Sequence, residues 1–170
     1  GETRQAIVQQ RIKQSFFRRA VLASYGGRCC MSGVSDSRLL VASHIVPWRE
    51  DKANRLNPSN GLCLSAIHDK AFDSGLIALS DDFCVLVSTE LLDRKDTFVD
   101  QVFAPIMGRR IEIPERFVPD KELIRREVIR YINGMKERGA RWVFGSDHSI
   151  STNTTYESFK YALDVYREHM

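Results

Sequence analysis

Two short apolar runs on either side of a long polar loop constrain this chain more than any other feature. The first run covers residues 39–42 and leads into His44, and the second covers residues 62–64 and follows Asn60. Both runs have the length and apolar character of short buried strands. The residues after the second run favour a helix that ends near residues 74–75, where a glycine suits the position after a helix. The sequence therefore predicts the order strand, loop, strand, helix.

Three polar side chains lie at the ends or in the first turns of the predicted strands and helix. His44 ends the first strand, Asn60 opens the turn into the second, and His68 falls in the first turns of the helix. Hydrolysis of a phosphodiester needs a base that deprotonates water and a cation that neutralises developing charge. An imidazole, with an ordinary pKa of about 6.5, accepts protons at neutral pH. His44 therefore suits the base, and His68, on a rigid helix, suits a metal ligand.

Each of these residues also has an ordinary structural interpretation. His44 could be a half-buried strand histidine that is hydrogen-bonded to the backbone. Asn60, which precedes Gly61, could simply form a turn with positive φ. His68 could be a surface residue of the helix. The residue types alone leave these alternatives open.

Residues 14–88 resemble the HNH endonucleases, whose ββα-metal fold is shared with colicin DNases and many homing endonucleases. The match is carried by FFRRAVLASYGGRCCMSG, LLVASHIVPW and NRLNPSNGLCLSAIHDKAFDSGLIAL. The subfamily that these segments resemble is that of bacterial restriction endonucleases. The resemblance implies an α+β fold: a ββα-metal (HNH) nuclease core at about residues 39–75, with flanking helices and an added β-hairpin.

The resemblance also implies roles for individual residues. His44 would be the general base, Asn60 would steady the loop and touch the metal, and His68 would be a metal ligand. Many relatives carry Asp or His directly before the first histidine, whereas this chain has Ser43, a poorer ligand. Asp73 is the candidate that would complete the ligand set, because an acid in the last turn of a helix opposes the helix dipole. Residues 68 and 73 lie about 140° apart on an ideal helix, so both reach one ion only where the helix ends or bends between them.

The expected activity is metal-dependent endonuclease cleavage of DNA, in restriction or defence against foreign DNA, leaving 5′-phosphate and 3′-hydroxyl ends. Mg²⁺ or Mn²⁺ is the expected cofactor, and Zn²⁺ or Ni²⁺ is the alternative because imidazole ligands favour them. A second hypothesis is a DNA-binding module with a degraded, inactive nuclease site, which Ser43 suggests. The four cysteines form no C-x-x-C pair, so the sequence predicts no zinc knuckle and favours reduced, buried thiols.

The net charge of +3 is only mildly basic, so the distribution of charge is more informative than its sum. In a helix predicted at residues 3–25, arginines recur every seven residues and share one face, while Val8, Ile12 and Phe16 mark another. Two further arginines flank the catalytic loop, and a third group follows later, although plain solvation would explain each of them. The arginines expected to bind DNA phosphates are Arg11, Arg18, Arg49 and Arg55.

The rest of the chain gives coarser expectations. Pro47 and Trp48 are expected to pack at the exit of the first strand, without a catalytic role. Residues 76–79 and 83–88 predict a hairpin that extends the sheet of the motif, and Asp120 predicts the cap of a helix. That helix would bury Ile124, Val128, Tyr131, Ile132 and Met135.

We expect a nuclease domain at residues 1–132 and an extension at residues 133–170, packed on the same domain. In the extension we expect a strand at residues 142–144 and a short helix with Tyr156, Phe159, Leu163 and Tyr166. The first residue is Gly, which suggests a fragment of a longer protein. An N-terminal specificity domain or a homodimer partner is therefore expected beside DNA. The sequence carries no apolar run for a membrane span, so a cytoplasmic location is expected.

Overall fold

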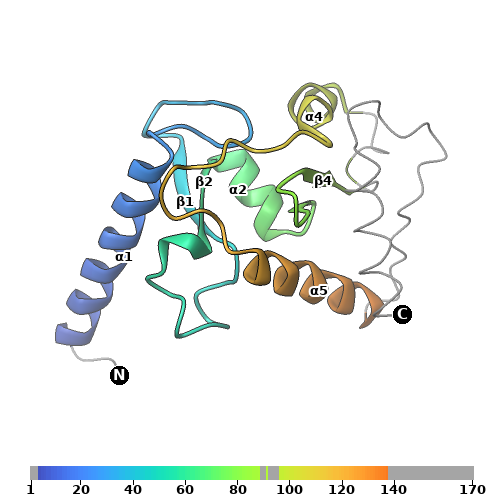
Figure 1. Ribbon diagram of the computed structural model, residues 1–170. Coiled ribbons are helices and arrows are strands. Elements are labelled where there is room, and N and C mark those ends of the chain that lie inside the picture. Colours follow the sequence, from blue (N-terminus) through green and yellow to red (C-terminus); the bar gives the residue numbers. More distant parts are fainter. Residues whose placement is uncertain (1–3, 89–90, 92–95, 138–170) are drawn as a thin grey trace. The chain divides into compact units, whose positions relative to one another are not determined.

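The structure is a computed structural model that describes residues 4–88, 91 and 96–137 (Figure 1). Helices and short antiparallel strands alternate along these residues, so the predicted α+β class is confirmed. The chain divides into two compact units, one of residues 1–69 and 112–123 and the other of residues 70–111 and 124–170. The domain boundary that was predicted after residue 132 stays a prediction.

The first unit is built on a hairpin of two antiparallel strands. Strand β1 (Leu40–His44) pairs with β2 (Gly61–Ser65), in a register that runs from Leu40 opposite Ser65 to His44 opposite Gly61. Helix α1 (Arg4–Ser24) lies alongside this hairpin in Figure 1. Both strands and the first helix therefore form where the sequence predicted them.

The face of α1 that packs on the hairpin differs from the predicted apolar stripe. Phe17 and Val21, one turn apart, are 2% and 0% exposed, whereas Ile12 and Phe16 are 56% and 53% exposed. Phe16 and Phe17 lie about 100° apart around the helix, so burial of one turns the other outward. The contact with the hairpin, rather than the spacing of apolar residues within α1, decides which of them is buried.

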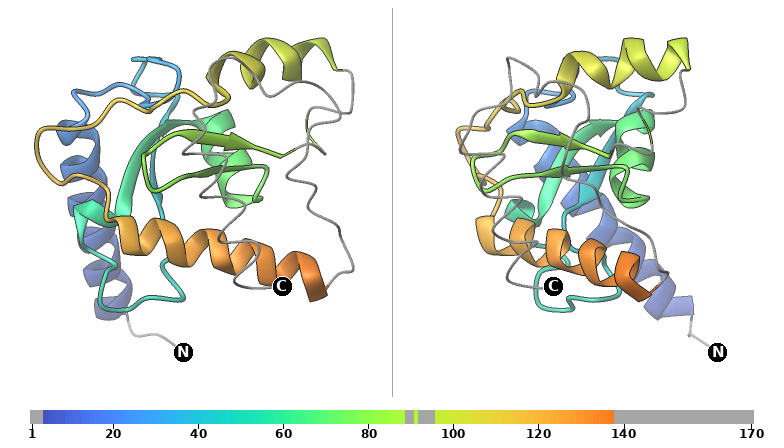
Figure 2. Two further views of the ribbon diagram at one scale, coloured as in Figure 1. Left: turned by 45° about the vertical axis from the view of Figure 1, so that its right-hand side comes forward. Right: turned by 90° about the vertical axis from the view of Figure 1, so that its right-hand side faces the viewer.

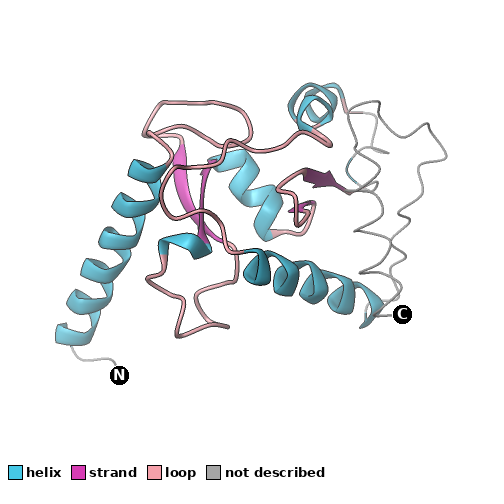
Figure 3. Ribbon diagram, viewed as in Figure 1, coloured by secondary structure: helices cyan, strands magenta, loops and turns pink. Residues whose placement is uncertain are grey.

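A polar network shapes the long loop between the two strands, which Figure 3 draws in pink. Asp51 accepts hydrogen bonds from the backbone of Ala53 and Asn54, both 3.1 Å long, and the side chain of Asn57 donates to Asn54. Asn57 also caps the short helix η1 (Pro58–Asn60) by accepting from the amide of Ser59. Because side chains satisfy the loop's own backbone, the loop holds a defined shape without regular structure.

Helix α2 (Ala66–Asp73) follows β2 directly, which completes the predicted strand, loop, strand, helix order. Its end is a Schellman motif: the amide of Gly75 bonds to Phe72, and the amide of Leu76 bonds to Ala71, both at 2.9 Å. Gly75 has φ +69°, a conformation that glycine adopts without strain. The glycine predicted to follow the helix therefore serves as its C-terminal cap.

In the second unit, β3 (Ile77–Leu79) and β4 (Val85–Val87) form the predicted antiparallel hairpin, seen in both views of Figure 2. The prediction that this hairpin extends the sheet of the motif is wrong, because within the described residues β3 and β4 form a separate two-stranded sheet. The amide of Val85 instead bonds to the carbonyl of Arg109, and Cys84 bridges Arg110. The segment around residues 109–110 thus occupies the edge of β4.

Helices α4 (Thr97–Val102) and α5 (Lys121–Glu137) follow, with the short helix η2 (Ala104–Ile106) after α4. Asp120 caps α5 by accepting from the amide of Glu122 at 2.9 Å, as predicted. The predicted buried stripe is confirmed at Ile124, Val128 and Tyr131. The side chains of residues 132 and 135, and every expectation for residues 138–170, lie outside the described part of the chain.

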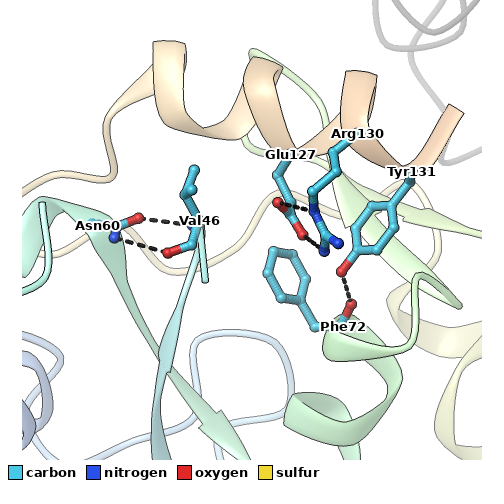
Figure 4. A network of polar contacts seen from close by, with 6 residues as sticks. All are labelled: Val46, Asn60, Phe72, Glu127, Arg130 and Tyr131. Carbon is cyan, nitrogen blue, oxygen red and sulfur yellow. Dashed lines mark hydrogen bonds and ion pairs between the residues drawn. The ribbon is translucent and has the colours of Figure 1, made fainter. Parts of the chain in front are cut away.

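A polar cluster on α5 anchors this helix within the second unit (Figure 4). The buried carboxylate of Glu127 pairs with the guanidinium of Arg130, and the hydroxyl of Tyr131 donates to the carbonyl of Phe72. Tyr131 also covers Gly75, where an added Cβ would come within 2.8 Å of its ring.

Among the residues that the structure describes, no helix is long and apolar enough to cross a membrane.

Candidate active site

His44 stands at the end of β1, half-buried, with its ring fixed by the loop that follows. Its Nε2 lies 3.0 Å from the backbone carbonyl oxygen of Arg55. A carbonyl oxygen can only accept a hydrogen bond, so Nε2 must carry the hydrogen. In the neutral ring the lone pair then lies on Nδ1, which is the atom able to take a proton. The predicted backbone hydrogen bond and the predicted base are therefore compatible.

Aromatic side chains enclose the His44 ring on two sides. Phe17 of α1 stacks on it with ring centroids 3.8 Å apart and planes within 8°, and Trp48 meets it edge-on at 5.6 Å. Arg55 lies over the Trp48 ring and donates from Nε to the Trp48 carbonyl at 2.7 Å. The sequence predicts only a packing role for Trp48 and none for Phe17, so both contacts with His44 are findings of the structure. Trp48 lies four residues after His44 in the sequence, whereas Phe17 lies far before it on a different element.

Asn60 is completely buried at the end of η1 and clamps the loop to the strand (Figure 4). Its Oδ1 accepts from the amide of Val46 at 2.8 Å, and its Nδ2 donates to the carbonyls of Val46 and Asn54 at 3.1 and 3.2 Å. Both hydrogens of the amide are thereby used within the loop. This geometry agrees with the predicted steadying role, whereas the predicted contact of Asn60 with a metal stays a proposal.

Gly61 is required by close packing against α1, and not by a turn with positive φ. Its φ is −131°, in the extended region, so the alternative of a positive-φ turn is wrong. An added Cβ at this position would lie 2.4 Å from Cγ2 of Val21 and 3.0 Å from Cζ of Phe17. The glycine therefore allows α1 to approach the hairpin closely.

His68 is buried in the first turn of α2, so the alternative of a surface histidine is wrong. Its Nδ1 lies 2.7 Å from Oγ of Ser65 and 3.9 Å from Sγ of Cys29. Ser65 also accepts from the backbone amide of His68 at 3.4 Å, so it caps the helix as well. The pattern of a serine three residues before His68 was a signal for Ser65 that the sequence analysis missed.

The thiol of Cys29 is perturbed at this place. Burial raises its pKa, but hydrogen bonds from His68, Ser32 and the backbone of Met31 outweigh burial and bring the pKa to about 6. All four cysteines are free and buried, as expected. Cys29 therefore contributes negative charge beside the His68 ring near neutral pH.

The donors available for a metal are few. Asp73 is exposed and ends α2, and because the helix is continuous from Ala66, Asp73 projects about 140° away from His68. Ser43 is buried, and its Oγ has no hydrogen-bond partner among the described residues. Within the same residues, no three His, Cys, Asp or Glu side chains form a group that could hold an ion. These donors fit an open site completed by water or substrate oxygens, and they do not fit a closed cage.

The four arginines predicted to bind DNA lie on two elements of the first unit. Arg11 and Arg18 are exposed on α1, seven residues apart and so on one face, and Arg18 reaches the carbonyl of Ser37 at 3.4 Å. Arg49 is exposed and Arg55 is half-buried in the loop after β1. The helix α1 contains five basic residues and no acidic residue. The helix α1 and the loop after β1, which both contact His44, therefore carry several positive charges.

Comparison with known proteins gives a family match within the first half of the chain. Residues 29–80 match the family model described as HNH endonuclease. A solved "Modification dependent TagI restriction endonuclease" is similar at 19% sequence identity and a TM-score of 0.49, over 67% of this chain and 36% of that one. Comparison with curated proteins gives no match. The matched segment holds His44, Asn60 and His68, so these three residues lie within a segment that is similar to HNH endonuclease domains.

Proposed function

We propose that this chain hydrolyses DNA phosphodiester bonds in a metal-dependent reaction with His44 as the general base. The observation that carries the proposal is the hydrogen bond from Nε2 of His44 to the Arg55 carbonyl. It leaves Nδ1 as the proton acceptor in the neutral ring, which is the state a general base needs before water is deprotonated. The half-buried position between Phe17 and Trp48 supports the same role, because a base acts best when its ring is held in one orientation.

The residue that would hold the metal is His68, with Asn60 as the further ligand. The sequence also suggested Asp73, but in the continuous helix α2 it projects about 140° away from His68 and does not fit the same ion. His68 presents an imidazole whose Nδ1 is engaged by Ser65, which directs ligation to Nε2. When bound, a divalent ion at this place would neutralise charge on the phosphate and stabilise the leaving 3′ oxygen. The open donor set favours Mg²⁺ or Mn²⁺, which keep water ligands, over Zn²⁺ or Ni²⁺.

The arginines of α1 and the loop would hold the DNA. Arg11, Arg18, Arg49 and Arg55 all belong to the unit that contains His44 and can pair with phosphate oxygens. Such contacts position the duplex without specifying its sequence. The setting that we propose is restriction or defence in the cytoplasm, with an N-terminal specificity domain or a second copy of the chain as partner. This setting rests on the resemblance of the motifs to restriction endonucleases.

A second candidate function is DNA binding without cleavage. Ser43 favours it, because its buried hydroxyl takes the place where many relatives carry a metal-binding Asp or His. The two candidates differ in one observable: both bind DNA, and only the nuclease breaks it.

The deciding experiment is cleavage of supercoiled plasmid with Mg²⁺, Mn²⁺, Ni²⁺ or EDTA. Nicking or linearisation that is lost with EDTA and in His44→Ala, while both proteins bind DNA, supports the nuclease. His148→Ala is the matched control, because this histidine lies outside the segment that matches the HNH model. Wild-type protein that binds DNA but never cuts under any ion would favour the degraded site.

A further inference from the structure

The ring that stacks on His44 comes from another part of the chain. Phe17 belongs to α1, and its ring lies parallel to the imidazole at a centroid distance of 3.8 Å. Aromatic pairs usually prefer offset or edge-on arrangements with larger centroid separations. A flat, close stack of this kind is held by the packing around it, since ring preference alone would not select it.

The buried face of the same helix places Phe17 beside the His44 ring. Phe17 and Val21 are buried against Gly61, the residue paired with His44 across the hairpin. Even one added carbon at Gly61 would meet both side chains, at 3.0 and 2.4 Å. Helix α1 is therefore seated on the hairpin at the position of His44, and the buried ring of Phe17 packs against both Gly61 and the imidazole.

The hydrogen bond to Arg55 and the stack with Phe17 restrain the imidazole in different ways. The hydrogen bond restrains the position of Nε2, whereas a stacked ring restrains the tilt of the imidazole plane. A tilt of this plane would move Nδ1 away from a bound water. A parallel ring 3.8 Å away blocks rotation out of the plane, and the edge of Trp48 closes another direction.

We propose that Phe17 is a positioning residue that fixes the ring plane of His44 and so aims Nδ1 at the water to be activated. The inference rests on the proposed function of His44 as the base. Misplacement of a reacting group by about 1 Å can lower a rate by about 100-fold. Removal of the Phe17 ring should accordingly lower kcat while the binding of DNA, which depends on phosphate contacts, changes little.

The test compares Phe17→Leu, which removes the stacked ring, with Val21→Ala, which trims the same buried helix face and leaves the Phe17 ring in place. We expect kcat to fall about 10-fold to 100-fold in Phe17→Leu, with KM and DNA affinity within about twofold of wild type. Val21→Ala should keep kcat within about twofold at comparable loss of thermal stability. Equal loss of kcat in the two variants would assign Phe17 to general packing and overturn the inference.

A second readout needs no catalysis. Nitrogen-15 spectra of the histidine rings, recorded without DNA or metal, report the tautomer of His44. Wild type should show a protonated Nε2 and an unprotonated Nδ1, and in Phe17→Leu the two resonances should move toward each other as the ring gains freedom. Identical spectra in both proteins would overturn the inference. Wild-type protein that never cuts DNA but shows this spectral change would refute the proposed function and leave the positioning role intact.

Discussion

Nε2 of His44 and the backbone carbonyl of Arg55 are joined by a hydrogen bond of 3.0 Å, although Arg55 lies 11 residues further along the chain, within the long loop. The loop therefore does more than connect two strands. It supplies the acceptor that selects the tautomer of the histidine, and Asn60 clamps the same loop to the end of the strand. The shape of the loop and the protonation of the ring are thus linked.

Asn60→Ala should destabilise the protein by about 3 kcal/mol or more. The change leaves the amide of Val46 and the carbonyls of Val46 and Asn54 without their side-chain partner, in a place that is completely buried. Each buried polar group left unsatisfied costs about 1–3 kcal/mol. Urea denaturation measures the loss, and Asn54→Ala, at a half-buried position of the same loop, gives the comparison. Wild-type stability in Asn60→Ala would contradict the clamp.

Gly61→Ala should destabilise the protein by about 1–3 kcal/mol, because the new methyl group overlaps Val21 and crowds Phe17. Val21→Ala removes the nearer of these atoms and should recover part of the loss in the double variant. A double-mutant cycle in urea measures this coupling. Strictly additive effects would mean that α1 does not lie against Gly61.

Ser65→Ala should weaken metal binding by about 10-fold to 100-fold, because it removes the partner that orients the His68 ring. It should also lower stability by about 1 kcal/mol through loss of the helix cap. Calorimetric titration with Mn²⁺ measures the affinity. Ser74→Ala, at an exposed position just after α2, is the control. Equal affinities in the two variants would remove Ser65 from the metal site.

Stability should depend on pH through Cys29. Its pKa of about 6 in the folded protein lies below the ordinary value of 9.0. A group with a depressed folded pKa stabilises the fold above its unfolded pKa, and this stabilisation disappears as the pH falls through the folded pKa. The stability advantage of wild type over Cys29→Ser should therefore shrink as the pH falls from 9 to 6. Denaturation midpoints that run parallel over this range would show that Cys29 does not titrate there.

Removal of charge from α1 should reduce the salt dependence of DNA binding. If Arg11 and Arg18 each contact a phosphate, Arg11→Gln and Arg18→Gln should each reduce the slope of log affinity against log salt by about 1. Arg38→Gln is the control, because Asp36 already pairs with this guanidinium. Fluorescence anisotropy with a DNA duplex at several salt concentrations measures the slopes. Slopes that match wild type in both α1 variants would exclude these contacts.

The local part of the site could be predicted from the sequence. Each strand of the first hairpin, the helix that carries His68 and the glycine that ends this helix depend on residues within a few positions of one another. Apolar runs, turn residues and helix caps are therefore sufficient signals for them. The same short segment also indicated His44 and His68 as the candidate functional histidines, one at the end of a strand and one in the helix.

Predictions that depended on long-range packing were less successful. Ile12 and Phe16 look as suited to burial as Phe17 and Val21, and only the contact with Gly61 decides between them. The second hairpin has the pattern of a strand pair, but the pattern does not say which backbone lies at its edge. In the structure that place is taken by the segment around Arg109.

The sequence by itself determined a ββα unit with His44, Asn60 and His68 at defined places, because hydrophobic pattern and local hydrogen bonding act over a few residues. Only the tertiary structure decided that Phe17 stacks on His44, that the Arg55 carbonyl selects its tautomer and that Ser65 and Cys29 adjoin His68. These contacts join residues from different elements. Their geometry is set by how the elements pack, which the periodicity of a single element does not encode.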